Sequence, residues 1–367
     1  IRIKTKREHG IILGVLLAIG LSGFGAEMFR IAASAAGGKD MSFEKWSFVG
    51  YPLSRAVDGL AHGTLENWHQ GMWVTHVVAF IVFLALLPIT MLRHMFTSPL
   101  NMWLKDRDRP KGAMRAMPNL TETSLESFGA SVVEDFTWKQ LLDTDACTMC
   151  GRCTSVCPAH ATGKPLDPRE IVLKTGEVMA ASAPHGSVTP PLSVDKEITI
   201  SANSLFDRIT AEEVWSCTSC RACVQECPVS IDQLSVIMEL RRNLVLGESR
   251  FPEEVMPAFE SMEQRGSPWA FDPGDRGKWA AGMNIPTMAE MAERGERPEV
   301  LYWVGCMGSF DDRAKKTTVA FAQIMQASGV KFAILGQEEK CNGDPARRMG
   351  NEYLYQMLAK DNIETLE

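Results

Sequence analysis

The residues CTMCGRCTSVCP at 147–158 and CTSCRACVQECP at 217–228 are two copies of one cysteine pattern. In each copy, three cysteines are separated by two residues each, and a fourth follows after three more residues and precedes a proline. Three closely spaced thiolates can hold three corners of a [4Fe-4S] cluster, and the more distant fourth cysteine ligates the neighbouring cluster. The pattern therefore predicts a protein that binds two clusters and moves single electrons.

The two expected ligand sets exchange their fourth cysteine between the copies. One set is Cys147, Cys150, Cys153 and Cys227, and the other is Cys217, Cys220, Cys223 and Cys157. Zinc would need only four ligands, usually from two C-x-x-C pairs, and would leave the Cys-Pro pairs unexplained. Disulfides suit a small secreted domain, whereas this chain has 367 residues and gathers its cysteines in compact groups.

Two long apolar runs precede the cysteines. Residues 10–34 and 71–92 are each long enough to cross a hydrocarbon layer of about 30 Å, and they predict two transmembrane helices. A cleaved signal peptide is the alternative for the first run, but this run is too long for the apolar part of a signal peptide.

Basic residues flank this hairpin at both ends. They are Arg2, Lys4, Lys6 and Arg7 before it, and Arg93, Lys105, Arg107, Arg109, Lys111 and Arg115 after it. Because basic residues are retained on the cytoplasmic side, both ends should face the cytoplasm, where cysteines stay reduced. We therefore expect a multi-pass protein of the cell membrane with its iron–sulfur domains on the cytoplasmic side.

The second span and its flank carry two histidines. His76 and His94 are 18 residues apart, which on one helix equals five turns and about 27 Å along a shared face. Two b-type haems across a bilayer could each take one axial ligand from such a helix. The alternative is an interfacial His94 and a hydrogen-bonded interhelical His76. Each haem would need a second axial ligand. His9, His62 and His69 lie near the ends of the spans, but an interfacial or loop role is expected for each, so the missing ligands are expected upstream of Ile1.

Glu27 and Arg30 lie near the outer end of the first span. Their spacing predicts an i,i+3 ion pair. The alternative for Arg30 is a contact with a haem propionate or a quinone.

The sequence predicts several domains. We expect a transmembrane domain at 1–96, a connector at 97–135, an α-helical two-cluster ferredoxin domain at 136–245, a linker at 246–297 and an α/β domain at 298–367. Prolines such as Pro99 should break any long helix in the connector. In the ferredoxin domain, residues 167–181 predict one helix, and Ser230 is expected to cap another that buries Leu234, Ile237, Met238 and Leu240.

The last segment has the pattern of a βαβ unit. Residues 301–305 and 331–336 predict buried parallel strands, and residues 312–328 predict the helix between them. Cys306 and Cys341 both follow a strand, where α/β sheets build their sites. Since no G-x-G-x-x-G opens a helix, we expect any flavin to belong to a partner.

The charge balance and the chain ends bound the function further. A net charge of -7 and a pI near 5.6 argue against nucleic-acid binding. The chain starts with Ile1 close to a membrane span and ends at Glu367 without a closing element, which suggests part of a longer protein.

These motifs resemble membrane-anchored iron–sulfur oxidoreductases related to the heterodisulfide reductase D subunit and to the iron–sulfur subunit of anaerobic glycerol-3-phosphate dehydrogenase. The two spans look like the last two helices of a nitrate reductase gamma-type cytochrome b, with His76 and His94 on its haem-bearing last helix. The stretches 251–269 and 276–279 are similar to the family's junction between its ferredoxin and cysteine-rich domains.

The final segment resembles the start of the family's cysteine-rich domain, in which a first cysteine is followed at a distance by Cys-Cys-Gly. Here 34 residues separate Cys306 from Cys341, which fits, but Asn342 replaces the second cysteine of the pair. This departure speaks against the noncubane clusters with which heterodisulfide reductases cleave disulfides. The segment CNGDPARRMGNE at 341–352 looks most like the branch of electron-transfer-flavoprotein:menaquinone oxidoreductases.

The resemblance implies a path for electrons from reduced electron transfer flavoprotein through iron–sulfur clusters and haem b to menaquinone. Cys306 and Cys341, with cysteines beyond Glu367, would hold a third, atypical iron–sulfur centre; the alternative is two buried free thiols. Two other functions stay open: a heterodisulfide or thiol-disulfide reductase, and a non-catalytic relay and membrane-anchor subunit of a larger dehydrogenase complex.

Overall fold

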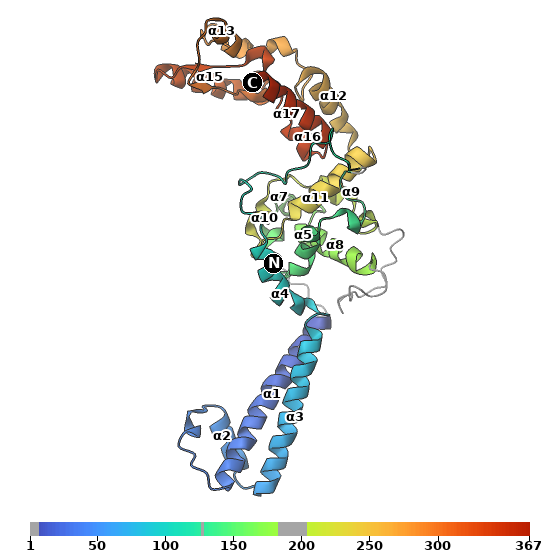
Figure 1. Ribbon diagram of the computed structural model, residues 1–367, viewed down its shortest axis with the longest axis vertical. Helices are drawn as coiled ribbons and strands as arrows, with labels where there is room; N and C mark the ends of the chain where they lie inside the picture. Colours follow the sequence, from blue (N-terminus) through green and yellow to red (C-terminus); the bar gives the residue numbers. More distant parts are fainter. Residues whose placement is uncertain (1–6, 126–127, 183–203) are drawn as a thin grey trace. The chain divides into compact units, whose positions relative to one another are not determined.

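The computed structural model describes residues 7–125, 128–182 and 204–367 (Figure 1). Three of the flanking basic residues, Arg2, Lys4 and Lys6, lie outside these ranges. The chain forms two compact units. The first comprises Ile1–Asp108, Phe136–Ser216 and Arg221–Gln233, and the second comprises Arg109–Asp135, Cys217–Cys220 and Leu234–Glu367.

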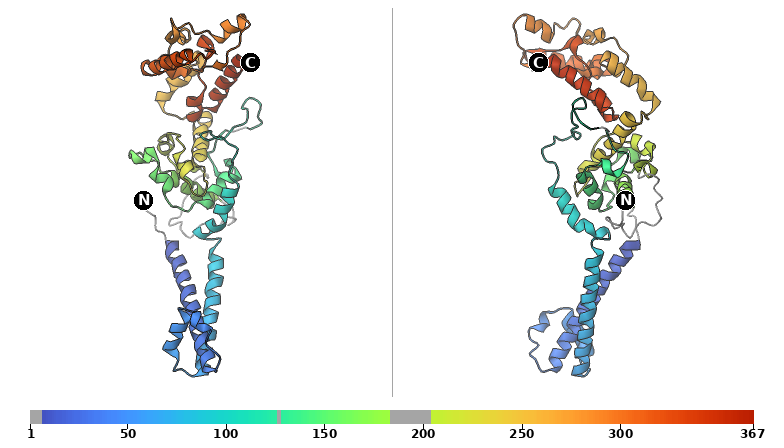
Figure 2. Two further views of the ribbon diagram at one scale, coloured as in Figure 1. Left: turned by 90° about the vertical axis from the view of Figure 1, so that its left-hand side faces the viewer. Right: turned by 45° about the vertical axis from the view of Figure 1, so that its right-hand side comes forward.

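The first unit begins with a hairpin of two long helices, α1 (Arg7–Ala36) and α3 (His62–Leu86), which lie side by side (Figures 1 and 2). Both are long and apolar enough to cross a membrane. Large apolar side chains on both are more than half exposed, for example Leu13, Leu21 and Ile81. A helix in the core of a soluble domain would bury such side chains, so their exposure favours a lipid-facing surface.

The second apolar helix ends earlier than the sequence predicted. The helix α3 stops at Leu86, a turn follows, and α4 (His94–Trp103) starts a new helix after the 3-10 turn η3 (Met91–Arg93). Pro88 explains the break, because proline lacks the N–H that would continue the helix and its ring clashes with the preceding turn. His76 and His94 therefore lie on different helices, and the prediction of one shared face five turns long is wrong.

Arg30 at the end of α1 has a different partner from the predicted one. Its two terminal nitrogens donate to the carboxylate of Glu44 at 2.7 and 2.8 Å, whereas Glu27 accepts a hydrogen bond from Ser47 at 2.8 Å. Glu44 lies in η1 (Glu44–Trp46), in the segment that also contains α2 (Gly50–Ser54) and η2 (Arg55–Val57). The i,i+3 pair is wrong because the loop after α1 folds back and supplies a better-placed carboxylate.

The predicted connector starts with a helix that packs on the ferredoxin domain. Pro99 lies inside α4 and does not break it. The fully buried Asn101 of α4 donates to the carboxylate of Asp143 at 2.8 Å and to the carbonyl of Val229 at 2.9 Å. These tertiary bonds hold α4 in place, so the local penalty of the proline does not decide the structure.

The ferredoxin part of the first unit consists of short helices. They are α5 (Trp138–Ala146), α6 (Arg152–Ser155), α7 (Pro158–Ala161), α8 (Pro168–Ser182), α9 (Ala211–Trp215), α10 (Ala222–Glu226) and the 3-10 turn η6 (Leu205–Asp207). The helix predicted at 167–181 corresponds to α8. Capping boxes formed by Thr137 with Gln140 and by Thr210 with Glu213 fix the starts of α5 and α9.

The helix after the second cysteine motif is α11 (Gln233–Arg242), which continues as a π-helical turn, η7 (Asn243–Gly247). Its predicted core residues are confirmed, since Leu234, Ile237, Met238 and Leu240 are all buried. Ser230 is not its cap: this residue has a left-handed backbone, with φ of 60°, and the helix begins only at Gln233.

Further helices of the second unit lead to the last domain. They are η4 (Val133–Asp135), η8 (Glu253–Val255), α12 (Met256–Arg265), η9 (Pro273–Asp275), η10 (Lys278–Ala280) and α13 (Met288–Glu293). A small core of Trp279, Ala322, Met325, Phe332 and Ile334 joins this segment to the α/β domain.

The βαβ unit is confirmed in shortened form. The strands β1 (Val300–Leu301) and β2 (Phe332–Ala333) pair in parallel, with Val300 opposite Phe332, and α14 (Gly305–Phe310) and α15 (Asp312–Ala327) lie between them in sequence. Whereas β2 is buried as predicted, Val300 of β1 is 42% exposed. After β2 come η11 (Gly336–Glu338), α16 (Asp344–Arg348) and α17 (Glu352–Leu366).

Candidate iron–sulfur sites

Four cysteines of the first unit line one small cavity. They come from both motifs and are Cys147, Cys150, Cys153 and Cys227. Cys147 caps the end of α5, Cys153 lies in α6, and Cys227 caps the end of α10. The structure thus brings together the first three cysteines of one motif with the fourth of the other, as the expected ligand set requires.

Apolar residues pack around two of these cysteines. Val172, Val229 and Ile231 form a buried cluster against which Cys147 and Cys227 pack. Burial raises the pKa of Cys147 to about 12, and the neighbouring cysteines add to the effect because their thiolates would repel one another. Four thiolates are stable in such a place only beside strong positive charge, which iron would supply.

The donor set of this cavity is four cysteines, which suits an iron–sulfur cluster. Within the part of the chain that the structure describes, no three Cys, His, Asp or Glu side chains lie close enough to hold one metal ion. Zinc needs four ligands about 2.0–2.3 Å from one point, whereas a [4Fe-4S] cluster fills the space between its cysteines. The N–H of Ile231 donates to the sulfur of Cys227 at 3.3 Å, the kind of bond that tunes an iron–sulfur centre. The donor set therefore fits an iron–sulfur cluster.

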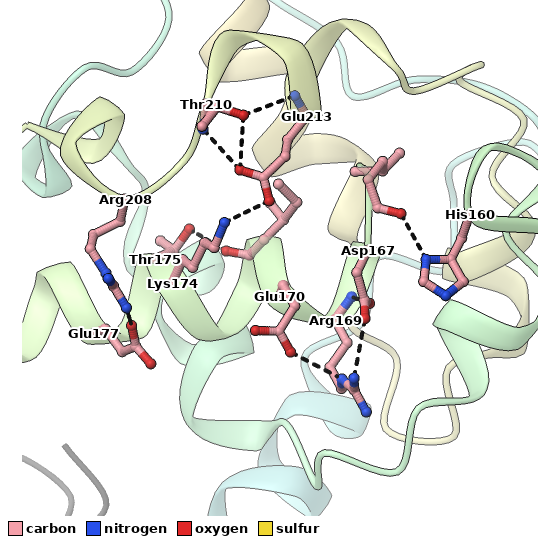
Figure 3. Close-up of polar contacts among 12 residues, drawn as sticks. His160, Asp167, Arg169, Glu170, Lys174, Thr175, Glu177, Arg208, Thr210 and Glu213 are labelled. Carbon is pink, nitrogen blue, oxygen red and sulfur yellow. Dashed lines mark hydrogen bonds and ion pairs between the residues drawn. The ribbon is translucent and has the colours of Figure 1, made fainter. Parts of the chain in front are cut away.

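Charged side chains on and beside α8 form several ion pairs (Figure 3). Arg169 lines the cavity and pairs with Asp167 at 3.1 Å and with Glu170 at 3.4 Å. Farther along α8, Lys174 bonds the carboxylate of Glu213 at 2.6 Å and so ties α8 to the cap of α9. The sequence reasoning missed Arg169; its place after the Pro-rich turn that starts α8 gave no signal of a contact with the cysteines.

The two motifs share an unusual backbone. Met149 and Ser219, each directly before the second cysteine, have φ of 53° and 56°. Gly151 and Arg221, each directly after it, have φ of 74° and 63°. Side chains rarely adopt this left-handed region, and such strain concentrates at functional sites. Both loops therefore have the same turn, although the residues between their cysteines differ.

The residues expected for the second cluster are divided between the two units. Cys157 and Cys223 belong to the first unit and are buried, whereas Cys217 and Cys220 belong to the second unit. In the second unit, the N–H of Ser219 donates to the sulfur of Cys217 at 3.4 Å.

The second unit also brings Cys306 and Cys341 together. Cys306 lies in the first turn of α14, and Cys341 follows η11. The thiol of Cys341 donates a hydrogen bond to Cys306 and, with the nearby Arg276, lowers the pKa of Cys306 to about 6. The same bond and burial raise the pKa of Cys341. The pair can therefore hold one thiolate and one thiol near neutral pH.

A buried ion pair holds this pair of cysteines. Arg276 donates to Glu339 at 2.9 Å, to the carbonyl of Gly266 at 3.0 Å and to the sulfur of Cys306 at 3.3 Å. Glu339 also accepts from the N–H groups of Val304 at 3.0 Å and Gly305 at 2.8 Å. The N–H groups of Val304 and Gly305 are therefore bonded to a side chain and not to a neighbouring strand. The sequence analysis included Arg276 only as part of the stretch 276–279, which resembles the family's domain junction, and it missed Glu339.

Three histidines in and after the hairpin contact backbone carbonyls. Nδ1 of His76 lies 3.0 Å from the carbonyl of Ile19, and Nδ1 of His69 lies 2.9 Å from that of Ala26. Nδ1 of His94 contacts the carbonyl of Met91. His62 forms an i,i+4 contact with Glu66 at 3.3 Å. A carbonyl on Nδ1 is the usual support of a histidine that ligates metal through Nε2.

Comparison with known proteins agrees with this arrangement. Residues 146–231 match the model of the 4Fe-4S dicluster domain, and residues 300–367 match the model of the cysteine-rich domain. No solved structure matches the chain significantly.

Three relatives define the class. EtfAB:quinone oxidoreductase of Syntrophomonas wolfei is 36% identical over 98% of this chain and 53% of its own length. A probable membrane-anchored ferredoxin of Chromohalobacter salexigens is 42% identical over 65% of this chain and 36% of its own length. The D subunit of dihydromethanophenazine:CoB–CoM heterodisulfide reductase of Methanosarcina barkeri is 29% identical over 64% of this chain and 54% of its own length.

The fold and the cysteine sites define an iron–sulfur electron-transfer protein. More particularly, the chain belongs to the family of iron–sulfur oxidoreductases that includes EtfAB:quinone oxidoreductase and the heterodisulfide reductase D subunit. The chain spans about half the length, or less, of these relatives.

Proposed function

We propose that this chain is part of a membrane-bound oxidoreductase that takes electrons from reduced electron transfer flavoprotein and delivers them to menaquinone. Two [4Fe-4S] clusters and haem b would be the one-electron carriers. The observation that carries the electron-transfer part is the cavity lined by Cys147, Cys150, Cys153 and Cys227, because it joins cysteines from both motifs. The similarity to EtfAB:quinone oxidoreductase over nearly the whole chain supports the donor and the quinone.

For the donor side we assign Cys306 and Cys341. They would contribute two ligands to a third iron–sulfur centre. The structure supports this assignment by placing the two sulfurs in hydrogen-bond contact, with Arg276 3.3 Å from Cys306. A positive charge beside two thiolates favours the deprotonated form that iron requires.

For the acceptor side we assign His76 and His94 as haem ligands. The break after α3 removes the argument from a shared helix face, so the assignment rests on how each ring is held. A backbone carbonyl contacts Nδ1 in both, and within the described residues no hydrogen bond engages Nε2 of either ring. Nε2 is thus available as an axial ligand. The ion pair with Glu44 makes a haem propionate or quinone contact of Arg30 less favourable than the sequence suggested.

We also propose a location in the cell membrane, with the cysteine domains on the cytoplasmic side. The exposed apolar surface of α1 and α3 and the similarity to a membrane-anchored ferredoxin support the anchoring. The basic residues after the second span, among them Arg107 and Lys111, support the orientation.

A thiol-disulfide reductase is the second candidate, since a heterodisulfide reductase subunit is among the relatives. Asn342 disfavours it, because an amide cannot replace the thiolate of a second adjacent cysteine. The third candidate function is a relay and anchor subunit without its own catalytic centre. Such a subunit would not accept electrons directly from a flavoprotein.

The test uses the full-length protein in a membrane preparation. Electron paramagnetic resonance (EPR) and pyridine haemochrome spectra count the clusters and haems. Mixing with reduced electron transfer flavoprotein and a quinone analogue should reduce the quinone. A protein that stays oxidised in this mixture contradicts the proposal, and reduction of a heterodisulfide instead would support the second candidate.

A further inference from the structure

Two arginines of the second unit hold the loop that carries Cys217 and Cys220. Arg241 of α11 donates to the carbonyl of Cys217 at 2.5 Å and to the hydroxyl of Ser219 at 3.2 Å. Arg348 of α16 donates to the carbonyl of Ser219 at 3.0 Å. The carbonyl of Arg348 in turn accepts from Arg241 at 2.6 Å. Two guanidinium groups therefore bind one short stretch of cluster-loop backbone.

Arg348 belongs to the segment DPARRMG at 344–350, near the end of the chain. Gly350 has φ of 90°, and a Cβ at this position would lie 2.7 Å from the carbonyl carbon of Arg241. Only glycine allows the turn after α16 to close against α11. The motif thereby sets the position of Arg348 next to the loop, and this role was not apparent from the sequence.

Arg241 is placed where its charge acts strongly. The residue is 2% exposed, so little water screens its guanidinium group. A buried cation is costly unless nearby acceptors and negative charge compensate it. The loop offers both, since its carbonyls accept directly and its two cysteines become thiolates when they ligate iron. Arg348 is more exposed and also pairs with Asp344 at 2.7 Å, so its charge should act more weakly.

The bonds also act through the peptide groups. A donor on the carbonyl of Cys217 polarises the peptide whose N–H belongs to Thr218, and a donor on the carbonyl of Ser219 does the same for the N–H of Cys220. The left-handed residues Ser219 and Arg221 flank Cys220 in this loop, and successive N–H groups of such turns can face an anion. Stronger N–H donors and nearby positive charge both favour the reduced, more negative state of a cluster.

The first motif has a different electrostatic environment. The arginine that lines its cavity, Arg169, is paired with two carboxylates, Asp167 and Glu170, at 3.1 and 3.4 Å. These carboxylates offset its charge. The asymmetry between the motifs therefore lies in charge and not in the cysteine spacing, which is the same in both.

We propose that Arg241 and Arg348 are positioning residues that raise the reduction potential of the second cluster above that of the first. This inference rests on the proposed function, which supplies the two clusters. The DPARRMG segment, which lies in the cysteine-rich domain, would thus also adjust the reduction potential of the second cluster.

The test is a potentiometric titration of the full-length protein followed by EPR. A Cys220→Ser variant identifies which of the two [4Fe-4S] signals belongs to the second motif. Arg348→Gln removes one charge at a half-exposed position, and Arg241→Gln removes the buried one. The matched control is Arg347→Gln, because Arg347 belongs to the same motif but donates to the carbonyl of Arg115 and to Glu352.

We expect the second-cluster signal to move to lower potential in Arg348→Gln and further in Arg241→Gln, while the first-cluster signal stays in place. Arg347→Gln should leave the difference between the two signals unchanged. If Arg241→Gln fails to assemble its clusters, the shift of the second-cluster potential in Arg348→Gln alone decides between the outcomes. An unchanged potential difference in Arg348→Gln, or an equal change in Arg347→Gln, overturns the inference alone. A wild-type protein that does not show two [4Fe-4S] signals refutes the proposed function itself.

Discussion

Removing the carboxylate of Glu339 should loosen the site around Cys306. The side chains of Glu339 and Arg276 are 2% and 3% exposed and lie 2.9 Å apart, so Glu339→Ala leaves a buried guanidinium without its partner. The loss of one member of a buried ion pair costs about 3–5 kcal/mol. The N–H groups of Val304 and Gly305 also lose their acceptor. We therefore expect local opening of residues 300–311 to become roughly 10²- to 4 × 10³-fold more frequent, since each 1.4 kcal/mol is a factor of ten.

Hydrogen exchange measured by mass spectrometry on the full-length protein tests this expectation, because the amides of Val304 and Gly305 report the opening directly. Glu339→Gln keeps the shape and one acceptor oxygen and should show an intermediate effect. Lys340→Ala is the matched control: its neighbouring ion pair with Asp361 is 2.8 Å long but about half exposed, and such pairs contribute only about 0–1 kcal/mol. An exchange rate in Glu339→Ala within fivefold of that in Lys340→Ala would refute the reasoning.

Three further predictions concern the cysteine sites. In iron-free protein, Cys306 should react with iodoacetamide as a thiolate; because its pKa is lowered to about 6, its rate should rise between about pH 5 and 7 and then level off. Cys341→Ala should move that rise to higher pH, and an unchanged profile would contradict the hydrogen bond between the two thiols. Arg221→Gly should raise the stability of the protein by up to about 1 kcal/mol in thermal unfolding, because φ of 63° suits glycine, and the converse change Gly151→Arg should lower it. Asn101→Ala should destabilise the first unit by about 1–3 kcal/mol, because it removes the side-chain donor to the buried carbonyl of Val229 and one of the donors to Asp143, which keeps Lys139. It should also lower the iron content of the first cluster, and a full iron complement at wild-type stability would disprove this.

Short-range patterns were sufficient for several elements. The two cysteine motifs, the helix at α8, the buried face of α11 and the βαβ unit all follow from residues close in sequence, where spacing and apolar periodicity determine local geometry. The expectation that His76 and His94 share one helix failed at Pro88, whose effect on the backbone outweighs the apolar character of the surrounding run. The expected pair of Glu27 and Arg30 failed for a different reason, because Glu44 from a later loop competes for the same guanidinium group.

The sequence by itself determined that this chain carries two cysteine motifs suited to iron–sulfur clusters, since the ligand spacing is written in consecutive residues. Only the tertiary structure decided which charged groups surround the cysteines. Arg276 meets Glu339 across 63 positions, and Arg348 meets Ser219 across 129. Such pairs form because tertiary packing brings together elements that are far apart in sequence, and no local pattern records which partners will meet. Arg276 and Glu339 are also both buried, where low dielectric strengthens their interaction.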